Sequence, residues 1–208
     1  MGLVRKHARQ RLEEVLPEEP TPDALLGLLG DPDVECRREA ALGLVGVTEA
    51  VPELLVRAGV EKDPRVLESI LITLAAHDTA EVAGSIAVHL ASDDAWRRTA
   101  AAAALATMPR SVPALMPALI AAPDHDVRVM TAMVLAALPH PEVRTWLVRM
   151  ISEDPHPNVV TAAIDVLLPA ATLEDVALLE AAVRRFPDDP FLRFTVQSAL
   201  PRLAGTPA

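Results

Sequence analysis

The chain has 208 residues, of which 51% are hydrophobic and only 2% aromatic, and it carries a formal net charge of −10. Packing must therefore depend on small and branched aliphatic side chains, which favours closely packed helices over a β-sandwich. The negative charge argues against binding to nucleic-acid phosphate or to an anionic membrane, because both require a positively charged face.

The sequence gives two indications of cellular location. No N-terminal apolar stretch resembles a signal peptide, since Leu3 and Val4 are followed at once by charged residues. The longest apolar run, residues 99–108, is too short to cross a bilayer. The single cysteine, Cys36, excludes an intramolecular disulfide. We therefore expect a cytoplasmic protein.

The N-terminal segment, residues 1–20, is expected to hold a cap helix over residues 3–16 and a proline-rich connector. Thr21 then stands where an N-cap is needed, and the next helix has Pro22 and Asp23 in its first turn, where proline and negative charge are favoured. From residue 21 to residue 203 we expect a domain of helical repeats, followed by a disordered tail over residues 204–208.

One pattern returns six times in this domain, with copies 30 to 33 residues apart. Each copy begins at an apolar position that we expect to be buried: Cys36, Val66, Trp96, Val127, Val159 and Leu192. Three residues earlier stand the expected N-caps of the same helices: Asp33, Asp63, Asp93, Asp124, His156 and Asp189. A helical pattern with this period predicts stacked two-helix units, of which this is the second helix.

The first helix of each unit has fewer markers. Val51 and Val112, each followed by proline, open two of these helices, and each stands 15 residues before the first apolar position of its unit. Residues 172–175 resemble a capping box at the start of the last unit. Pro117 falls inside a predicted helix and is expected to kink it.

The second helices resemble HEAT repeats, in particular the short bacterial type that is also found in phycobilin lyase subunits. The resemblance is carried by residues 36–44 (CRREAALGL), by residues 96–101 (WRRTAA) and by Val127-Arg128 with Thr131-Ala132. It covers residues 21–203. It implies an all-α fold, a right-handed α-solenoid of about six two-helix repeats, with an N-terminal cap helix and with the second helices lining a concave face.

The resemblance also implies a ladder of charged contacts between neighbouring repeats. The aspartates of the N-cap positions would pair with the arginines of the second helices: Arg37, Arg97, Arg128 and Arg193. Leu67 and Val160 stand where two further arginines are expected, so the ladder is interrupted.

Two clusters of residues are candidates for metal sites. Residues 124–126 (Asp-His-Asp) and residues 154–156 (Asp-Pro-His) offer oxygen and nitrogen ligands in equivalent turns of adjacent repeats. Neighbouring helices lie ~8–10 Å apart, which is too far for most shared ligand sets, so we interpret these residues as helix caps. No glycine-rich phosphate loop or nucleophile elbow occurs. We expect no enzyme activity, no cofactor and no metal.

The outward positions of the second helices predict the binding surface. If positions zero, four, five, seven and eight from the first apolar residue are buried, positions two, three and six face the concavity. The partner-binding residues predicted on this basis are Arg38, Leu42, Ile72, Arg98, Val129, Met130 and Met133. Tight curvature would instead bury Val129 and Met130. An apolar patch with a charged rim is typical of protein interaction sites.

These residues predict a non-catalytic scaffold or adaptor that binds a helix or extended segment of another protein, with Arg38 and Arg98 orienting an acidic group. Two alternatives stay open. A phycobilin-lyase-like subunit, or another component that handles small molecules, would carry a coloured or tightly bound ligand. A nucleic-acid-binding glycosylase of HEAT-like fold, disfavoured by the acidic charge, would show salt-sensitive retention on heparin.

Overall fold

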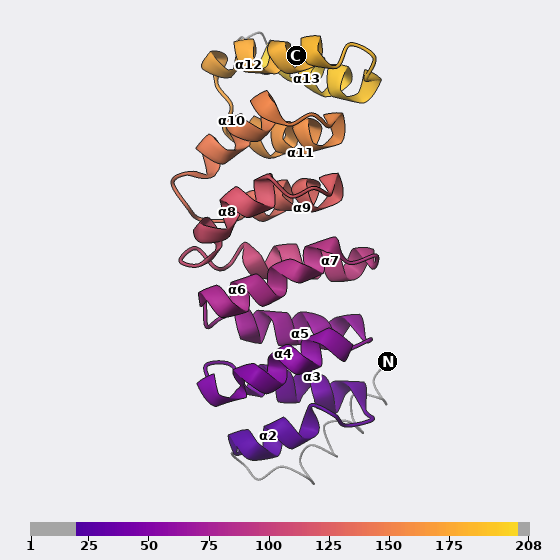
Figure 1. Cartoon of the computed structure of the whole chain (residues 1–208), viewed down its shortest axis with the longest axis vertical. Helices are drawn as coiled ribbons and strands as arrows, with labels where there is room; N and C mark the ends of the chain where they lie inside the picture. Colours follow the sequence, from indigo (N-terminus) through magenta and orange to yellow (C-terminus); the bar gives the residue numbers. More distant parts are fainter. Residues whose placement is uncertain (1–19, 204–208) are drawn as a thin grey trace. The chain divides into compact units, whose positions relative to one another are not determined.

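The computed structural model describes residues 20–203, and the regular structure in that range is entirely helical (Figure 1). Within the described residues, twelve α-helices form six consecutive pairs, which confirms the all-α prediction of two-helix repeats. The predicted cap helix and the predicted disordered tail lie outside the described residues. None of the helices in residues 20–203 is long and apolar enough to cross a membrane.

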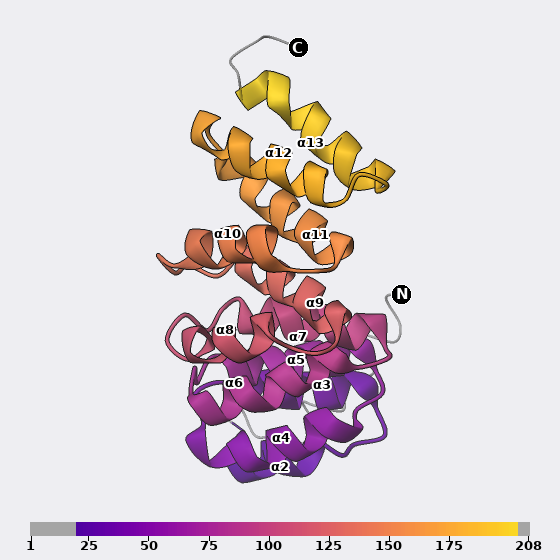
Figure 2. The ribbon, with the colours of Figure 1, turned by 45° about the horizontal axis from the view of Figure 1, so that its top comes forward.

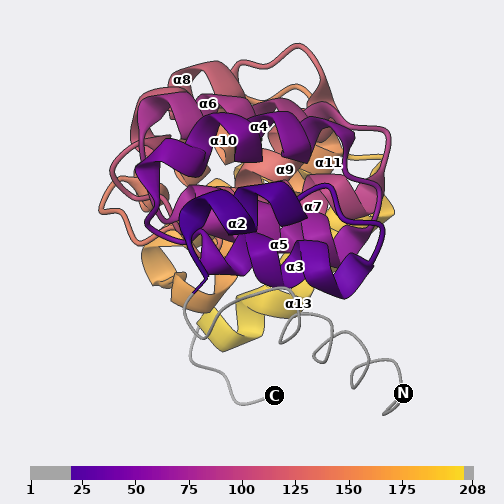
Figure 3. The ribbon, with the colours of Figure 1, turned by 90° about the horizontal axis from the view of Figure 1, so that it is seen from below.

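The contacts divide the chain into two compact units, one up to Ser111 and the other from Val112 on. The helices of the first unit are α2 (Pro22–Leu28), α3 (Val34–Gly43), α4 (Val51–Val60), α5 (Pro64–Ala75), α6 (Ala80–Ala87) and α7 (Ala95–Leu105). In this unit α5 packs against both α3 and α7. The first helices of the three repeats, α2, α4 and α6, form the other layer, which we call the first-helix layer (Figures 1 and 3). Between the layers lie fully buried leucines and isoleucines such as Leu54, Ile70 and Leu74.

The helices of the second unit are α8 (Val112–Ile120), α9 (His125–Leu135), α10 (Val143–Glu153), α11 (Pro157–Leu167), α12 (Val176–Arg185) and α13 (Pro190–Leu203). Here α11 packs against α9, α10 and α13 (Figure 2). Pro117 lies inside α8, as predicted. The predicted capping box is present before α12, where the Asp175 carboxylate accepts a hydrogen bond of 2.8 Å from the Thr172 N–H.

The second helices begin at side-chain caps, which satisfy amide groups that have no partner within the helix. Five of the six predicted caps are confirmed, because the side chain accepts a hydrogen bond from a backbone N–H of the first turn. These caps are Asp33, Asp63, Asp124, His156 and Asp189. Each such cap contributes about 1 kcal/mol to helix stability.

The third repeat differs from the prediction by one residue. The cap of α7 is Asp94, whose carboxylate accepts a hydrogen bond of 2.9 Å from the Trp96 N–H, and not Asp93. Because the helix begins one residue later, Trp96 takes the position that Glu35 has in α3, and its side chain is 51% exposed. The prediction that Trp96 is buried was therefore wrong.

The same shift changes which arginine of α7 corresponds to Arg37 of α3. The Arg37 guanidinium donates to the backbone carbonyl of Asp31, six residues earlier, at 2.8 Å. Arg98, and not Arg97, makes the equivalent contact in α7, with the carbonyl of Ser92 at 2.7 Å. The prediction that Arg97 pairs with an aspartate was therefore wrong: Arg97 instead donates to the backbone carbonyls of Ala58 and Glu61 in the preceding repeat.

Candidate functional site

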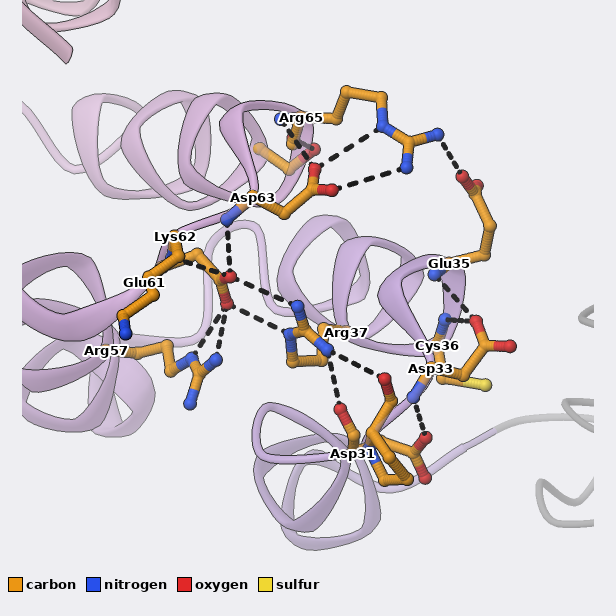
Figure 4. A network of polar contacts seen from close by, with 12 residues as sticks. Asp31, Asp33, Glu35, Cys36, Arg37, Arg57, Glu61, Lys62, Asp63 and Arg65 are labelled. Atoms are coloured by element: carbon orange, nitrogen blue, oxygen red, sulfur yellow. Dashed lines mark hydrogen bonds and ion pairs between the residues drawn. The ribbon is translucent and has the colours of Figure 1, made fainter. Parts of the chain in front are cut away.

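A buried carboxylate joins the first and second repeats of the first unit (Figure 4). Glu61 directly follows α4 and is 2% exposed. It accepts two hydrogen bonds from Arg37, of 3.0 and 3.1 Å, and two more from Arg57. The backbone N–H groups of Lys62 and Asp63 each donate to it at 2.9 Å. Both oxygens of the Glu61 carboxylate are therefore engaged by hydrogen bonds within the protein.

The pKa of Glu61 follows from these contacts. Burial alone would raise the pKa, but the hydrogen bonds from Arg37, from the Asp63 N–H and from Arg57 outweigh it and lower the pKa to about 2. The carboxylate is thus ionised at any physiological pH. A charge so completely bound holds helices together and has no capacity left for a ligand.

The second unit repeats this arrangement. The Arg128 guanidinium of α9 donates two hydrogen bonds, of 2.7 and 3.1 Å, to the carboxylate of Asp154, which directly follows α10. Both side chains are buried. The predicted ladder was therefore right about Arg37 and Arg128 but wrong about their acidic partners. These follow the first helix of the next repeat, because the N-cap aspartates are engaged with their own helices.

An open cavity of about 270 Å³ in the second unit lies against this pair, with Ile120 and Met150 among its lining residues. Its charged groups are bound to one another, Arg128 to Asp154 and Arg149 to Glu153 at 3.1 Å. The cavity therefore presents no unpaired charge to a small molecule.

The two candidate metal clusters, residues 124–126 and 154–156, form turns that cap helices. His156 caps α11, since its Nδ1 accepts a hydrogen bond of 3.3 Å from the Asn158 N–H. Its ring stacks on that of His125, with 3.9 Å between the centroids. In the part of the chain that the structure describes, no group of three or more His, Cys, Asp or Glu residues could hold a metal ion. Cys36 is buried, as predicted.

The exposed side of each second helix consists of the residues two, five and nine places after its N-cap. In the first unit, we name as the second-helix face Glu35, Arg38, Leu42, Arg65, Glu68, Ile72, Trp96, Thr99 and Ala103. In the second unit, the second-helix face consists of Asp126, Val129, Met133, Asn158, Thr161, Asp165, Phe191, Phe194 and Ser198. This spacing places three residues on one side of a helix. Of the eighteen, Thr161 alone is buried.

Three of the predicted binding residues of the first unit lie on its second-helix face. Ile72 is 51% exposed, whereas Leu42 is half-buried. Arg38 is also half-buried and pairs with Glu35 at 3.0 Å and with Glu39. Arg98 lies one residue away from this face, and its guanidinium is bound to backbone carbonyls. Neither arginine is therefore a free cation that could orient an acidic group.

Two of the three predicted binding residues of the second unit lie on its second-helix face. Met133 is 44% exposed and Val129 is half-buried. Met130 is only 7% exposed, so the prediction that it is available to a partner was wrong. The equivalent residue in the first unit, Ser69, is 6% exposed. The side chain at this position is thus covered in α5 and α9, whereas Glu39, at the same position of α3, is exposed.

Three exposed aromatic residues of these faces, Trp96, Phe191 and Phe194, were not among the predicted binding residues. Trp96 and Phe191 stand two residues after their caps, and Phe191 is 63% exposed. The exposure of Trp96 could have been anticipated, because either Asp93 or Asp94 fits the cap of α7 and a cap at Asp94 turns Trp96 outward. The exposure of Phe191 could have been anticipated from its spacing: it stands three residues before Phe194 and so lies on the same side of α13, one turn earlier.

The comparison with protein families agrees with the two-helix repeats of the structure. The family of HEAT repeats matches residues 21–106 and 112–201. Among solved structures, the chain is similar to an engineered protein determined by the Northeast Structural Genomics Consortium. The two share 18% sequence identity over 89% of this chain and 97% of that chain, with a TM-score of 0.38. A comparison with curated proteins finds no match.

Proposed function

Because this chain belongs to the HEAT repeat family, we propose that it is a cytoplasmic, non-catalytic scaffold or adaptor that binds another protein on its second-helix faces. HEAT repeats commonly serve as protein-interaction scaffolds. The partner segment would be a helix or an extended stretch lying across neighbouring second helices. The charged networks around Glu61 and Asp154 support a non-catalytic role, since their groups are bound to one another.

The observation that carries this proposal is the placement of the aromatic side chains. The whole chain contains three phenylalanines, two tryptophans and no tyrosine. Three of these five residues lie exposed on the second-helix faces: Trp96 at 51%, Phe191 at 63% and Phe194 at 67%. Large aromatic residues dominate the energetics of protein interfaces, and exposed ones weaken solubility unless a partner covers them.

The gain from covering such side chains is sufficient for specific binding. Full burial of one large apolar side chain contributes roughly 1.5–3 kcal/mol. Part of this gain offsets the lost freedom of the two molecules and the ordering of side chains. Several anchors must therefore act together, which favours a partner segment long enough to cross more than one repeat.

Affinity capture from the native lysate tests the proposal. Ile72→Glu in the first unit and Phe194→Glu in the second each place a charge on a second-helix face. The matched control is Val56→Glu, because Val56 of α4 is 64% exposed but belongs to the first-helix layer. We expect at least one face variant to lose a co-purifying protein that the control retains. Equal capture by the wild type and all three variants would contradict the proposal.

A further inference from the structure

The two second-helix faces differ in how their charges are balanced. In the first unit the acidic Glu35 accepts a hydrogen bond of 2.8 Å from Arg65 and one of 3.0 Å from Arg38. The second-helix face of the second unit contains Asp126 and Asp165 and no lysine or arginine. The face of the first unit is thus largely compensated from within, whereas that of the second unit is anionic.

Asp165 is the acidic residue in the middle of this second face. It lies on α11, which packs between α9 and α13 (Figure 2). Within residues 20–203, its carboxylate has no hydrogen-bond or ion-pair partner at contact distance. The arginines of α13 are engaged elsewhere, Arg193 with the carbonyl of Pro187 and Arg202 with that of Leu168 at 2.9 Å.

The surroundings of Asp165 remove part of its hydration. The side chain is exposed on the outer side of α11, yet burial by the surrounding protein raises its pKa above the ordinary value for aspartate. A carboxylate in this condition gains more from a cation than a fully hydrated one does, because less water must be displaced and the local dielectric constant is lower.

Each adjacent second helix also carries an exposed apolar side chain on this face. Met133 stands on α9 at the same distance from its cap as Asp165 on α11, and it is 44% exposed. Phe194 stands on α13 about one turn nearer to the cap and is 67% exposed. This face thus presents the unpaired carboxylate of Asp165 together with two exposed apolar side chains, the flexible Met133 and the aromatic Phe194.

We propose that the second-helix face of the second unit binds a basic amphipathic segment of a partner protein. A lysine or arginine of that segment pairs with Asp165, and apolar residues on either side of it contact Met133 and Phe194. This inference rests on the proposed function and specifies its partner chemistry. It also replaces the expectation that arginines of the face orient an acidic group, since those arginines are already bound.

The test uses a library of randomised 16-residue peptides displayed on phage and selected on the full-length protein. We expect the enriched peptides to combine a lysine or arginine with apolar residues. Synthetic copies should bind Asp165→Asn about tenfold more weakly than the wild type, as is typical for a hydrogen bond to a charged group. Met133→Glu should weaken them further if the apolar contacts are correct.

The matched control is Glu53→Gln. It removes one negative charge from an exposed position on α4, outside both second-helix faces, and so reproduces the change in net charge. Equal weakening in both variants would reduce the effect to general electrostatic attraction and overturn the inference. Enriched peptides without basic residues, or peptides that bind Asp165→Asn as well as the wild type, would overturn it too.

The outcomes also separate this inference from the proposed function. Peptides whose binding is lost in Ile72→Glu but retained in Asp165→Asn would place recognition on the first unit, so that the scaffold proposal stands and the present inference falls. A selection that enriches no peptide, together with a lysate capture that yields no partner, would overturn both.

Discussion

Arg37 and Glu61 lie 24 residues apart in the sequence and form two hydrogen bonds that fasten α3 to the end of α4. Arg128 and Asp154, 26 residues apart, do the same for α9 and α10. In both units an ion pair with a buried carboxylate therefore connects the second helix of one repeat to the first helix of the next. The same carboxylates accept hydrogen bonds from the N–H groups of Asp63 and His156, the caps of α5 and α11, so each pair also ties one second helix to the start of the next.

Glu61→Gln should lower the free energy of unfolding by about 3 kcal/mol, because it removes the buried counter-charge of the half-buried Arg37 guanidinium. Urea denaturation followed by circular dichroism measures this loss. The control is Glu53→Gln on α4, an exposed position whose replacement should change stability by less than about 0.5 kcal/mol. Similar losses in both variants would mean that the ion pair contributes little.

Acid should destabilise the wild type in a pH range set by Glu61. Its pKa is about 2 in the folded chain against 4.5 for an ordinary glutamate, so its stabilising effect is complete above pH 4.5 and is lost as the pH falls towards 2. At about 1.4 kcal/mol per pKa unit, the total is on the order of 3 kcal/mol. Stability curves measured at several pH values should be flatter for Glu61→Gln in this window. Parallel curves for the two proteins would contradict the assignment.

Met130 and Met133 are three residues apart on α9, and replacing each by glutamate should have unequal effects. Met130→Glu places a charge in the core and should cost about 3 kcal/mol or more. Met133→Glu should change stability by less than about 0.5 kcal/mol, because this side chain is exposed. Thermal denaturation of the two variants is a direct comparison. A loss at Met133 as large as that at Met130 would place Met133 in the core as well.

Asp165→Asn should stabilise the free protein at neutral pH. Burial raises the pKa of Asp165, so the ionised carboxylate disfavours the folded state once the pH exceeds the ordinary aspartate value. The melting temperature of the variant should exceed that of the wild type at pH 7, and the difference should disappear near pH 3. A lower melting temperature at pH 7 would show that Asp165 has a stabilising partner, and the reason for proposing an external cation would disappear.

The repeat architecture was predictable because it depends on local signals. Caps such as Asp33 and Asp63 stand at nearly constant distances from small and apolar residues, and a helix start is decided within one turn. The third repeat shows the limit of this reasoning. Asp93 and Asp94 both suit a cap, and a difference of one residue turns Trp96 from the core to the surface.

The binding surface was predicted less well because exposure depends on neighbouring helices. Ile72 and Met133 were placed correctly from helix periodicity alone. Met130 was not, since the packing of α11 against α9 decides whether that position is covered. Which acidic group each arginine meets was also unpredictable, because Arg37 and Glu61 meet only after two repeats have packed.

Site-specific photo-crosslinking tests most directly whether partners bind the second-helix faces. A photoreactive amino acid would replace Ile72 or Met133 on these faces, and Val56 or Val60 on α4, which are exposed by 64% and 60%. Irradiation in the native lysate should yield crosslinked proteins from the first two positions and none from the other two. Crosslinks that form only from Val56 and Val60 would place the binding surface on the first helices and contradict the proposed function.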